Sequence, residues 1–314
     1  MLSISKDEIR SIVPMADAIL SMRKAFSDFS SGLVIVPDRM SMEIDGKNAT
    51  VLLMSAYRNK GKYFITKVVT VFQNTISNRS DLISAYVNVF DASTGDMVAT
   101  LDGGTITSLR TGAASGLATT LLAKKDATVA AIFGTGVQAH TQVEAIISSR
   151  PIERVFVYSR DIGSAKKFSK YISETYFVNA NPGESDDLSL ADIICTATPS
   201  TKSLFRHQDL KEGTHINAIG SFKPVMREIP PETIVKAKVV VDSISACKKE
   251  AGDLIMAAKE KQWSFDNIYS EIGKIASDKI SGRSNDNEVT IFKSVGLGIQ
   301  DLAISELVLD RLNI

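Results

Sequence analysis

Three basic side chains within the first 110 residues stand among apolar or small neighbours. Arg39 follows Pro37-Asp38, Lys67 interrupts the strand-like run YFITKVVTVF at 63–72, and Arg110 lies in a stretch rich in Ala, Gly and Leu. An arginine can bind a carboxylate through two parallel hydrogen bonds. A partly buried lysine can lose its proton at accessible pH and act as an acid or a base. These residues are candidates for holding and transforming a small acid, and the alternative for each is a surface charge or a structural ion pair.

The segment GTGVQA at 134–139 follows an apolar run and opens a helical pattern. This is the context in which a glycine-rich loop binds a dinucleotide. Gly134 permits the tight turn, Gly136 lets the backbone approach the pyrophosphate, and Ala139 permits close helix–strand packing. The amides at the helix N-terminus then bind phosphate. The alternative is an ordinary glycine-rich turn between a strand and a helix.

Ser159 and Arg160 end the next strand, where an NAD-selective site usually has Asp or Glu. A hydroxyl and a guanidinium are better suited to a 2′-phosphate. The sequence therefore predicts NADPH in preference to NADH as the cofactor. The alternative is that Arg160 is a solvated loop residue and Asp161 binds the ribose.

Two further loops, 196–198 and 219–221, end later apolar runs. Ligands of parallel sheets lie at the carboxyl ends of the strands. We therefore expect these loops to line the nicotinamide end of the cofactor, unless they are simple strand-end turns.

The first part of the chain predicts antiparallel strands combined with helices. The apolar spacing from Met15 to Phe29 indicates a helix. A second helix is expected near Arg110, with Thr105 or Thr107 as its cap. Strands are predicted over 50–54, 63–72, 85–91 and 96–101.

From about residue 127, strand and helix patterns alternate, which is typical of a parallel sheet. The predicted fold class is α/β, with a Rossmann doubly wound parallel sheet and a second unit of antiparallel strands and helices. The substrate-binding and dimerisation domain is expected over 1–118 and 297–314, and the dinucleotide-binding domain over 119–296. The predicted strands are 128–133, 154–158, 192–196, 215–219 and 238–242, and the helices are 137–149, 163–176 and 298–312.

Composition narrows the class of partner. The 314 residues are 44% hydrophobic and 23% charged, with 36 basic and 36 acidic residues. Such a neutral chain has no global field for nucleic acid or an anionic membrane. Two cysteines and three scattered histidines show no metal-ligand spacing, and no apolar run reaches the length of a membrane span. We expect a cytoplasmic protein with a small-molecule substrate and no metal.

Two long stretches carry a family resemblance. LDGGTITSLRTGAAS at 101–115 and VTIFKSVGLGIQD at 289–301 resemble signatures of the ornithine cyclodeaminase/mu-crystallin family. The order of Arg39, Lys67, Arg110, the glycine-rich turn and the segment 217–220 also matches. The resemblance covers nearly the whole chain. It implies a nicotinamide cofactor and a reaction at a carbon–nitrogen bond next to a carboxylate.

The resemblance also implies roles for single residues. Arg39 and Arg110 would bind the substrate carboxylate, and Lys67 would sit near the amine or imine nitrogen. A homodimer is implied, with the interface on the first domain. The implied cofactor residues are Val137 and Gln138 at the pyrophosphate, Ser159 at the adenosine ribose, and Thr196, Asn217, Ala218, Ile219 and Val295 around the cofactor.

Phe222 departs from the cyclodeaminases, which carry Asp two residues after the glycine that matches Gly220. Phenylalanine cannot accept a proton or hold the side-chain ammonium of ornithine. We therefore do not expect ornithine cyclodeaminase activity. Phe222, Met54 and Met40 would instead line a pocket for a ring without a second amine.

The sequence thus predicts an NAD(P)H-dependent reductase of an α-imino acid, such as Δ1-pyrroline-2-carboxylate giving L-proline. The first alternative is an alanine dehydrogenase, which joins pyruvate and ammonia. An ornithine cyclodeaminase is the next, and a non-catalytic protein that binds the cofactor or another ligand is the last.

Overall fold

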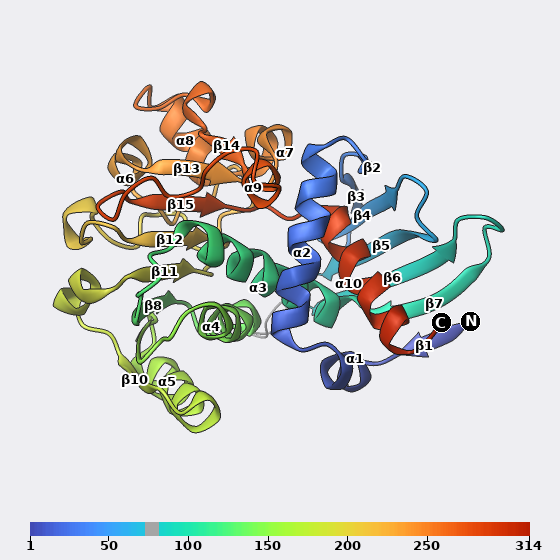
Figure 1. Ribbon diagram of the computed structural model, residues 1–314, viewed down its shortest axis with the longest axis horizontal. Coiled ribbons are helices and arrows are strands. Elements are labelled where there is room, and N and C mark those ends of the chain that lie inside the picture. Colours follow the sequence, from blue (N-terminus) through green and yellow to red (C-terminus); the bar gives the residue numbers. More distant parts are fainter. Residues whose placement is uncertain (73–81) are drawn as a thin grey trace. The chain divides into compact units, whose positions relative to one another are not determined.

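The computed structural model describes residues 1–72 and 82–314, which form two compact units (Figure 1). The first unit contains Met1–Arg110 and Leu297–Ile314, and the second contains Thr111–Gly296. Our expected boundary at 118 differs from this division, which falls at Arg110, inside helix α3 (Gly103–Leu122). Small and apolar residues occur on every side of α3, so the sequence pattern does not change where the helix passes from one unit to the other.

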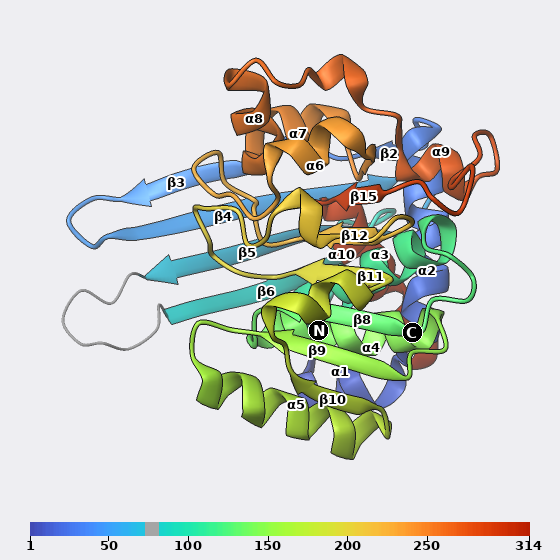
Figure 2. The same cartoon turned by 90° about the vertical axis from the view of Figure 1, so that its left-hand side faces the viewer.

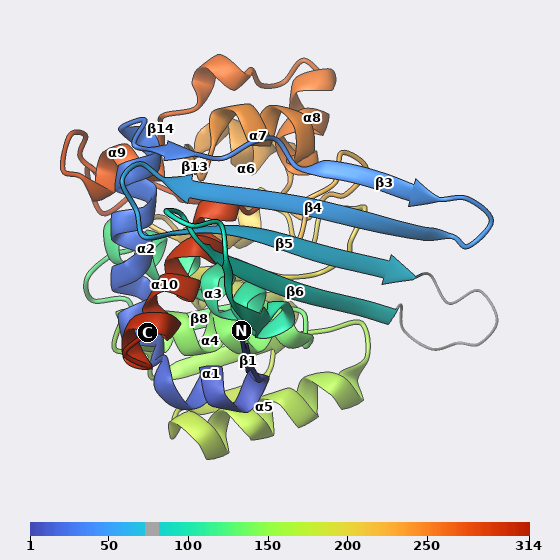
Figure 3. The ribbon, with the colours of Figure 1, turned by 90° about the vertical axis from the view of Figure 1, so that its right-hand side faces the viewer.

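The first unit contains a seven-stranded sheet. Strands β4 to β7 are antiparallel to one another, as the sequence predicts, and β4 is longer than the predicted 50–54, whereas the short β1 pairs with β7 in parallel. Strands β1, β2 and β3 were not predicted, because the first two are very short and β3 is mostly exposed. Figure 3 shows β3 to β6 side by side. The strands are β1 (Leu2–Ile4), β2 (Val34–Ile35), β3 (Met40–Ile44), β4 (Ala49–Arg58), β5 (Tyr63–Phe72), β6 (Leu82–Asp91) and β7 (Met97–Asp102).

Three helices accompany this sheet: α1 (Lys6–Ile12), α2 (Met15–Ser30) and α10 (Gly298–Arg311). Helix α10 contacts α2, β4 and β5 (Figure 1), and all of its first eight residues are buried. This packing places the last segment of the chain in the first unit, far in sequence from its neighbours.

The start of α3 differs from our prediction. Asp102, at the end of β7, accepts a hydrogen bond from the amide of Thr105 at 2.7 Å, so neither Thr105 nor Thr107 caps the helix. The helix begins at Gly103, because the strand leads directly into its first turn. A carboxylate at this position is as good a cap as a hydroxyl.

The second unit confirms the predicted α/β class with a parallel sheet. Its strand order is β10-β9-β8-β11-β12-β15-β13-β14, and every pairing is parallel. Figure 2 shows the part of this sheet from β10 to β15. The first five strands reproduce the order of a dinucleotide-binding sheet. The strands are β8 (Val129–Phe133), β9 (Arg154–Tyr158), β10 (Asn179–Pro182), β11 (Ile193–Thr196), β12 (His215–Ala218), β13 (Lys238–Val241), β14 (Ser270–Glu271) and β15 (Thr290–Lys293).

Two apolar clusters form the core of this unit. One joins the sheet to α4 and α5 through residues such as Val143 and Phe168, and the other joins it to α6, α7 and α8 through Ile234 and Leu254. The helices are α4 (Val137–Ser149), α5 (Ile162–Tyr176), α6 (Pro231–Lys236), α7 (Ile244–Glu250), α8 (Gly252–Lys259) and α9 (Ile272–Ala276), with short 3₁₀ turns at Ser185–Leu190, His207–Asp209 and Phe265–Asn267. Within the described ranges of the chain, no helix is long and apolar enough to span a membrane.

Candidate functional site

Lys67 is a buried cation in the middle of β5, with only 2% of its surface exposed. Its Nζ donates hydrogen bonds to Asp301 Oδ1 at 3.0 Å and to Thr107 Oγ1. Burial lowers the pKa of Lys67 to about 8, Asp301 opposes that change, and the positive charges of Arg110 and Arg39 add to it. An ammonium of this kind is mostly protonated at neutral pH and can still lose its proton.

Strand alternation explains why the lysine is inside. Successive residues of a strand point to opposite faces, so Ile65 and Lys67 share the buried face of β5. Met54 lies directly opposite Lys67 in the β4–β5 pairing and is also buried. The predicted pocket residue Met54 is therefore next to the lysine, whereas Met40 is 61% exposed.

Arg110 lies on α3 and faces the first turns of α10. Its Nη1 donates to Gln300 Oε1 at 3.1 Å, and its Nε lies 3.5 Å from Asp301 Oδ1. Asp301 is thus a fully buried carboxylate beside two cations, Lys67 and Arg110. The first unit therefore brings the predicted residues Arg39 and Arg110 within electrostatic range of Lys67.

Asp301 and Gln300 are functional candidates that our reading of the sequence missed. Both are completely buried. Among the described residues, neither Asp301 Oδ2 nor Gln300 Nε2 has a hydrogen-bond partner. Buried polar atoms are normally paired, so these two remain available to a bound molecule. The sequence did carry a signal: Gln300 and Asp301 are polar residues at the start of an apolar helix. They end the stretch 289–301, which we used only as evidence of a family resemblance.

The glycine-rich loop of the second unit fits a dinucleotide. Gly134 has φ +109°, and a Cβ there would lie 2.6 Å from the Ala197 carbonyl oxygen, so only glycine fits. Gly136 is the N-cap of α4 and makes no side-chain cap, and a Cβ there would meet nothing within 4 Å. The amides of an uncapped helix N-terminus are suited to phosphate. Val137 is exposed, and Gln138 Oε1 has no partner within the described part of the chain.

The end of β9 carries the residues predicted to select the cofactor. Ser159 and Arg160 are both exposed. Asp161, the alternative ribose ligand, caps α5: its carboxylate accepts from the amides of Gly163 at 3.3 Å and Ser164 at 2.8 Å. The carboxylate is therefore already used within its own helix.

The remaining predicted cofactor residues gather at one edge of the parallel sheet. Thr196, Asn217, Ala218, Ile219 and Val295 lie at or just beyond the carboxyl ends of β11, β12 and β15, which are neighbours in the sheet. All five are buried. The side chain of Asn217 donates to Thr119 Oγ1 at 3.0 Å and lies in the interior.

Two acidic residues that the sequence analysis missed organise this edge. Asp242 Oδ2 accepts from the amides of Val295 and Gly296, each at 2.8 Å. Glu228 accepts from Thr196 Oγ1 at 2.8 Å and from the Gly220 amide at 2.8 Å. The available signal for Asp242 was its place at the end of the apolar run 238–242, whereas the surroundings of Glu228 do not distinguish it from a surface carboxylate.

Phe222 belongs to the second unit, is 42% exposed and lies near the ammonium of Lys223. Its role in the substrate pocket stays a prediction. In residues 1–72 and 82–314, no group of three His, Cys, Asp or Glu residues is arranged to hold a metal ion.

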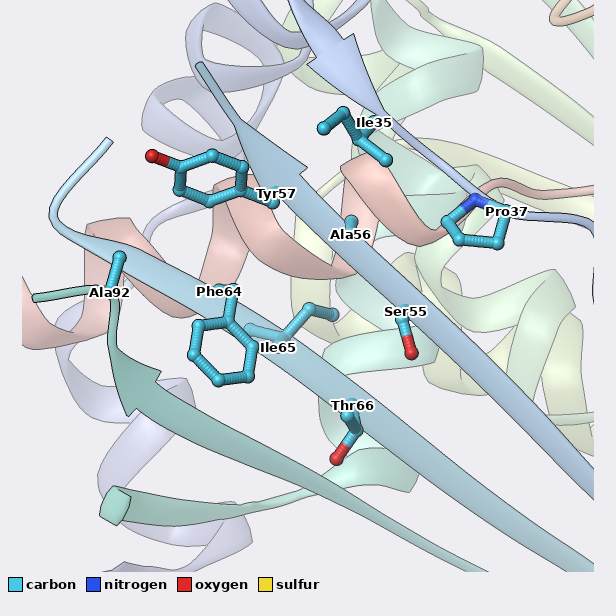
Figure 4. Close-up of a pocket in the computed structure, with 9 residues that line it drawn as sticks. All are labelled: Ile35, Pro37, Ser55, Ala56, Tyr57, Phe64, Ile65, Thr66 and Ala92. Carbon is cyan, nitrogen blue, oxygen red and sulfur yellow. The ribbon is translucent and has the colours of Figure 1, made fainter. Parts of the chain in front are cut away.

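A separate pocket lies on the first unit, on the opposite face of β4 and β5 from Lys67 (Figure 4). Its lining includes Tyr57, Phe64 and Thr66, which alternate along the strands with the inward-facing residues. Phe64 stacks on Phe90 with ring centroids 4.9 Å apart. This surface is mostly apolar, and the side chains of Phe64 and Thr66 point to the face of β5 away from Lys67.

Comparisons with known proteins agree over almost the full length. The model of the ornithine cyclodeaminase/mu-crystallin family matches residues 2–313. A Δ1-pyrroline-2-carboxylate reductase of Bacillus thuringiensis subsp. konkukian is 38% identical, over 99% of this chain and 96% of that protein.

Two solved structures are similar to the chain. The Thermococcus litoralis Δ1-pyrroline-2-carboxylate reductase, in complex with NADH and L-proline, matches with a TM-score of 0.93 and 33% identity, covering 100% of this chain and 98% of that one. An archaeal alanine dehydrogenase dimer with bound NAD matches with a TM-score of 0.92 and 30% identity. The match covers 100% of this chain and 97% of that chain.

Proposed function

We propose that this chain, which belongs to the ornithine cyclodeaminase/mu-crystallin family, reduces the carbon–nitrogen double bond of a cyclic α-imino acid such as Δ1-pyrroline-2-carboxylate. The chain is an NAD(P)-dependent oxidoreductase acting on C–N bonds. One observation carries the choice of reaction: a buried lysine with a pKa of about 8 lies beside a carboxylate and an arginine. The 38% identity to a reductase of this imino acid supports the choice of substrate.

Arg110 and Arg39 would bind the carboxylate of the substrate. Both act electrostatically on Lys67, so an acid bound by them brings its neighbouring nitrogen towards the same amine. Bidentate hydrogen bonds from a guanidinium fix the orientation as well as the position of a carboxylate. Gln300 holds Arg110 in place through the bond to Nη1.

Lys67 would donate a proton to the imine nitrogen. An ammonium has three N–H donors, of which one goes to Thr107 and one to Asp301. Because the ammonium is tetrahedral, the two hydrogen bonds fix the direction of the third N–H, which can then donate to the substrate nitrogen. Protonation makes the imine carbon electrophilic, and the neutral amine regains its proton from solvent after the reaction. The nicotinamide supplies the hydride.

The dinucleotide would be held by the second unit. The amides of Val137 and Gln138 at the start of α4 would bind the pyrophosphate, and the strand ends at 196–198 and 217–221 would face the nicotinamide. Ser159 and Arg160 would bind a 2′-phosphate, so we infer a preference for NADPH. The use of the Asp161 carboxylate as the cap of α5 supports this assignment.

Alanine dehydrogenase is the second candidate, because the chain is 30% identical to an archaeal alanine dehydrogenase and the same arginines and lysine would serve pyruvate. Met54, buried directly opposite Lys67, favours a ring over free ammonia. Phe222, in place of the cyclodeaminase Asp, disfavours ornithine.

The test follows the oxidation of NADPH and NADH with a panel of substrates. The panel contains Δ1-pyrroline-2-carboxylate, its six-membered homologue, and pyruvate with ammonia; ornithine with NAD⁺ is run separately. Fast turnover of a cyclic imine with little turnover of pyruvate supports the proposal. Turnover of pyruvate with ammonia alone moves the function to alanine dehydrogenase, and ornithine turnover contradicts our interpretation of Phe222. The variant that tests the proton donor is Lys67→Met, which keeps a linear side chain of similar size without the amine and should lose about 10²–10⁴-fold in turnover.

A further inference from the structure

We propose that Glu228 is a positioning residue of the dinucleotide site, whose carboxylate holds together the two loops that follow β11 and β12. The inference rests on the proposed function in one respect, namely that these loops face the nicotinamide.

Four hydrogen bonds converge on the Glu228 carboxylate. Oε2 accepts from Thr196 Oγ1 at 2.8 Å and from the Gly220 amide at 2.8 Å. Oε1 accepts from the Thr198 amide at 2.7 Å and from Thr198 Oγ1 at 2.8 Å. Glu228 is fully buried. The two loops are therefore joined through one side chain that lies between them.

The loops are packed against this carboxylate without spare room. A Cβ at Gly220 would lie 2.4 Å from Glu228 Oε1 and 2.4 Å from the Thr198 carbonyl oxygen. A displacement of the carboxylate must therefore move residues 198 and 220 as well. Interiors packed this closely transmit small shifts.

The backbone of Glu228 is held in place by a second carboxylate, that of Asp253. Its amide donates to Asp253 Oδ1 at 2.7 Å, and Asp253 pairs with Lys293 Nζ at 3.2 Å. Lys293 donates in turn to the Ala218 carbonyl oxygen at 3.1 Å. These contacts link Glu228, through Asp253 and Lys293, to Ala218 at the end of β12. Glu228 therefore connects the ends of β11 and β12, which also carry predicted cofactor residues.

Only a carboxylate satisfies this arrangement. Each of its oxygens faces one backbone N–H, which can only donate, and one hydroxyl, which can rotate. In Glu228→Gln the amide group would face the N–H of Thr198 or of Gly220, donor against donor, in either orientation. The variant keeps the size of the side chain and loses one bond to a loop.

The experiment compares Glu228→Gln with a matched control, Glu288→Gln. Glu288 also accepts from a backbone amide, that of Ser284 at 3.0 Å, and pairs with Lys238, but it contacts neither loop. NADPH binding is titrated by fluorescence, thermal unfolding is recorded, and KM for the imine is measured. We expect Glu228→Gln to bind NADPH about tenfold more weakly, with KM for the imine changed less than about twofold. Glu288→Gln should be less stable and bind NADPH normally.

Equal NADPH affinity in Glu228→Gln and the wild type, with lowered stability in both variants, overturns the inference and leaves Glu228 a structural residue. If Glu228→Gln does not fold, Thr198→Val carries the test, because it removes one hydroxyl donor to Oε1. It should weaken NADPH binding about two- to tenfold, and unchanged affinity overturns the inference. A wild-type protein that binds no nicotinamide cofactor refutes the proposed function too, whereas normal wild-type turnover confines the failure to Glu228.

Discussion

At the scale of single residues, the pKa of Lys67 gives a direct pH prediction. The proposed acid is the ammonium form of Lys67, and burial lowers its pKa from the ordinary lysine value to about 8. The kcat/KM for imine reduction should therefore fall as the pH rises through about 8. In the reverse direction the neutral amine accepts the proton, so amino acid oxidation should rise through the same pH. Rate profiles in both directions check this, and two flat profiles would contradict the proton role.

Asp301 should control that pH dependence. Its negative charge raises the pKa of Lys67 against the effect of burial. In Asp301→Asn the pKa should fall further, so the limb of the reduction profile moves to lower pH. Breaking a buried ion pair should also lower stability by about 3–5 kcal/mol, measured by denaturant unfolding.

Glu306→Gln is the matched control for Asp301→Asn, because Glu306 lies on the same helix and pairs with Arg58 at 3.2 Å. That change should leave the pH limb where it is. A limb that stays in place in Asp301→Asn would show that Asp301 does not act on Lys67.

Arg160 should decide between the two cofactors. Arg160 is exposed. Its guanidinium can bind a 2′-phosphate, which NADPH has and NADH lacks. Arg160→Ala should weaken NADPH binding about tenfold, as one charge-assisted hydrogen bond would require, and leave NADH binding nearly unchanged. Titration of both cofactors is the measurement. Equal losses for NADPH and NADH would remove the 2′-phosphate assignment.

At the scale of elements, the start of α3 lies so close to β6 that adding one methyl group to Gly103 should disturb their packing. A Cβ on Gly103 would lie 2.6 Å from the Ala85 carbonyl carbon and 2.7 Å from the Tyr86 amide nitrogen. Gly103→Ala should therefore force α3 away from β6, lower stability by about 1–3 kcal/mol and raise KM, because α3 carries Thr107 and Arg110.

Its neighbour provides the control. A Cβ on Gly104 meets only Asp102 Oδ1, at the ordinary distance of 3.5 Å. Gly104→Ala should be neutral or slightly stabilising, by up to about 1 kcal/mol. Denaturant unfolding and imine kinetics on both variants measure the difference, and equal behaviour of the two would be inconsistent with the close approach at Gly103.

The elements also show which sequence patterns are sufficient. The predicted bounds of β5 and β9 match the structure, because each is a run of β-branched and aromatic residues with clear ends. Strand β10 was missed, because its sequence NANP contains residues that disfavour strands. Its place at the edge of the sheet tolerates a proline.

At the scale of the whole molecule, we expect a homodimer formed through the first unit. The pocket with Phe64 and its stacked partner Phe90 makes part of this unit's sheet apolar, and an archaeal relative is described as a dimer. Light scattering should give twice the chain mass of 34.0 kDa. Phe64→Asp should shift the population towards the monomer, since it places a charge in the expected interface.

Phe177→Asp is the control for the dimer, because Phe177 is 91% exposed and lies on the second unit. It should leave the mass unchanged. A wild-type protein with the mass of one chain, or a Phe64→Asp variant that stays dimeric, would move the interface elsewhere or remove it.

The sequence by itself determined the α/β class and the glycine-rich loop, because local periodicity and residue chemistry suffice for these, and it singled out the three basic residues as candidates. It also showed that Lys67 lies within a strand, but only the structure shows that this lysine is on the buried face. The tertiary structure decided which polar groups surround that lysine. Asp301 is 234 positions away from Lys67 and reaches it only because α10 packs on β5. Glu228 likewise became visible only when two strand ends met, because hydrogen bonds between distant segments leave no periodic trace in the sequence.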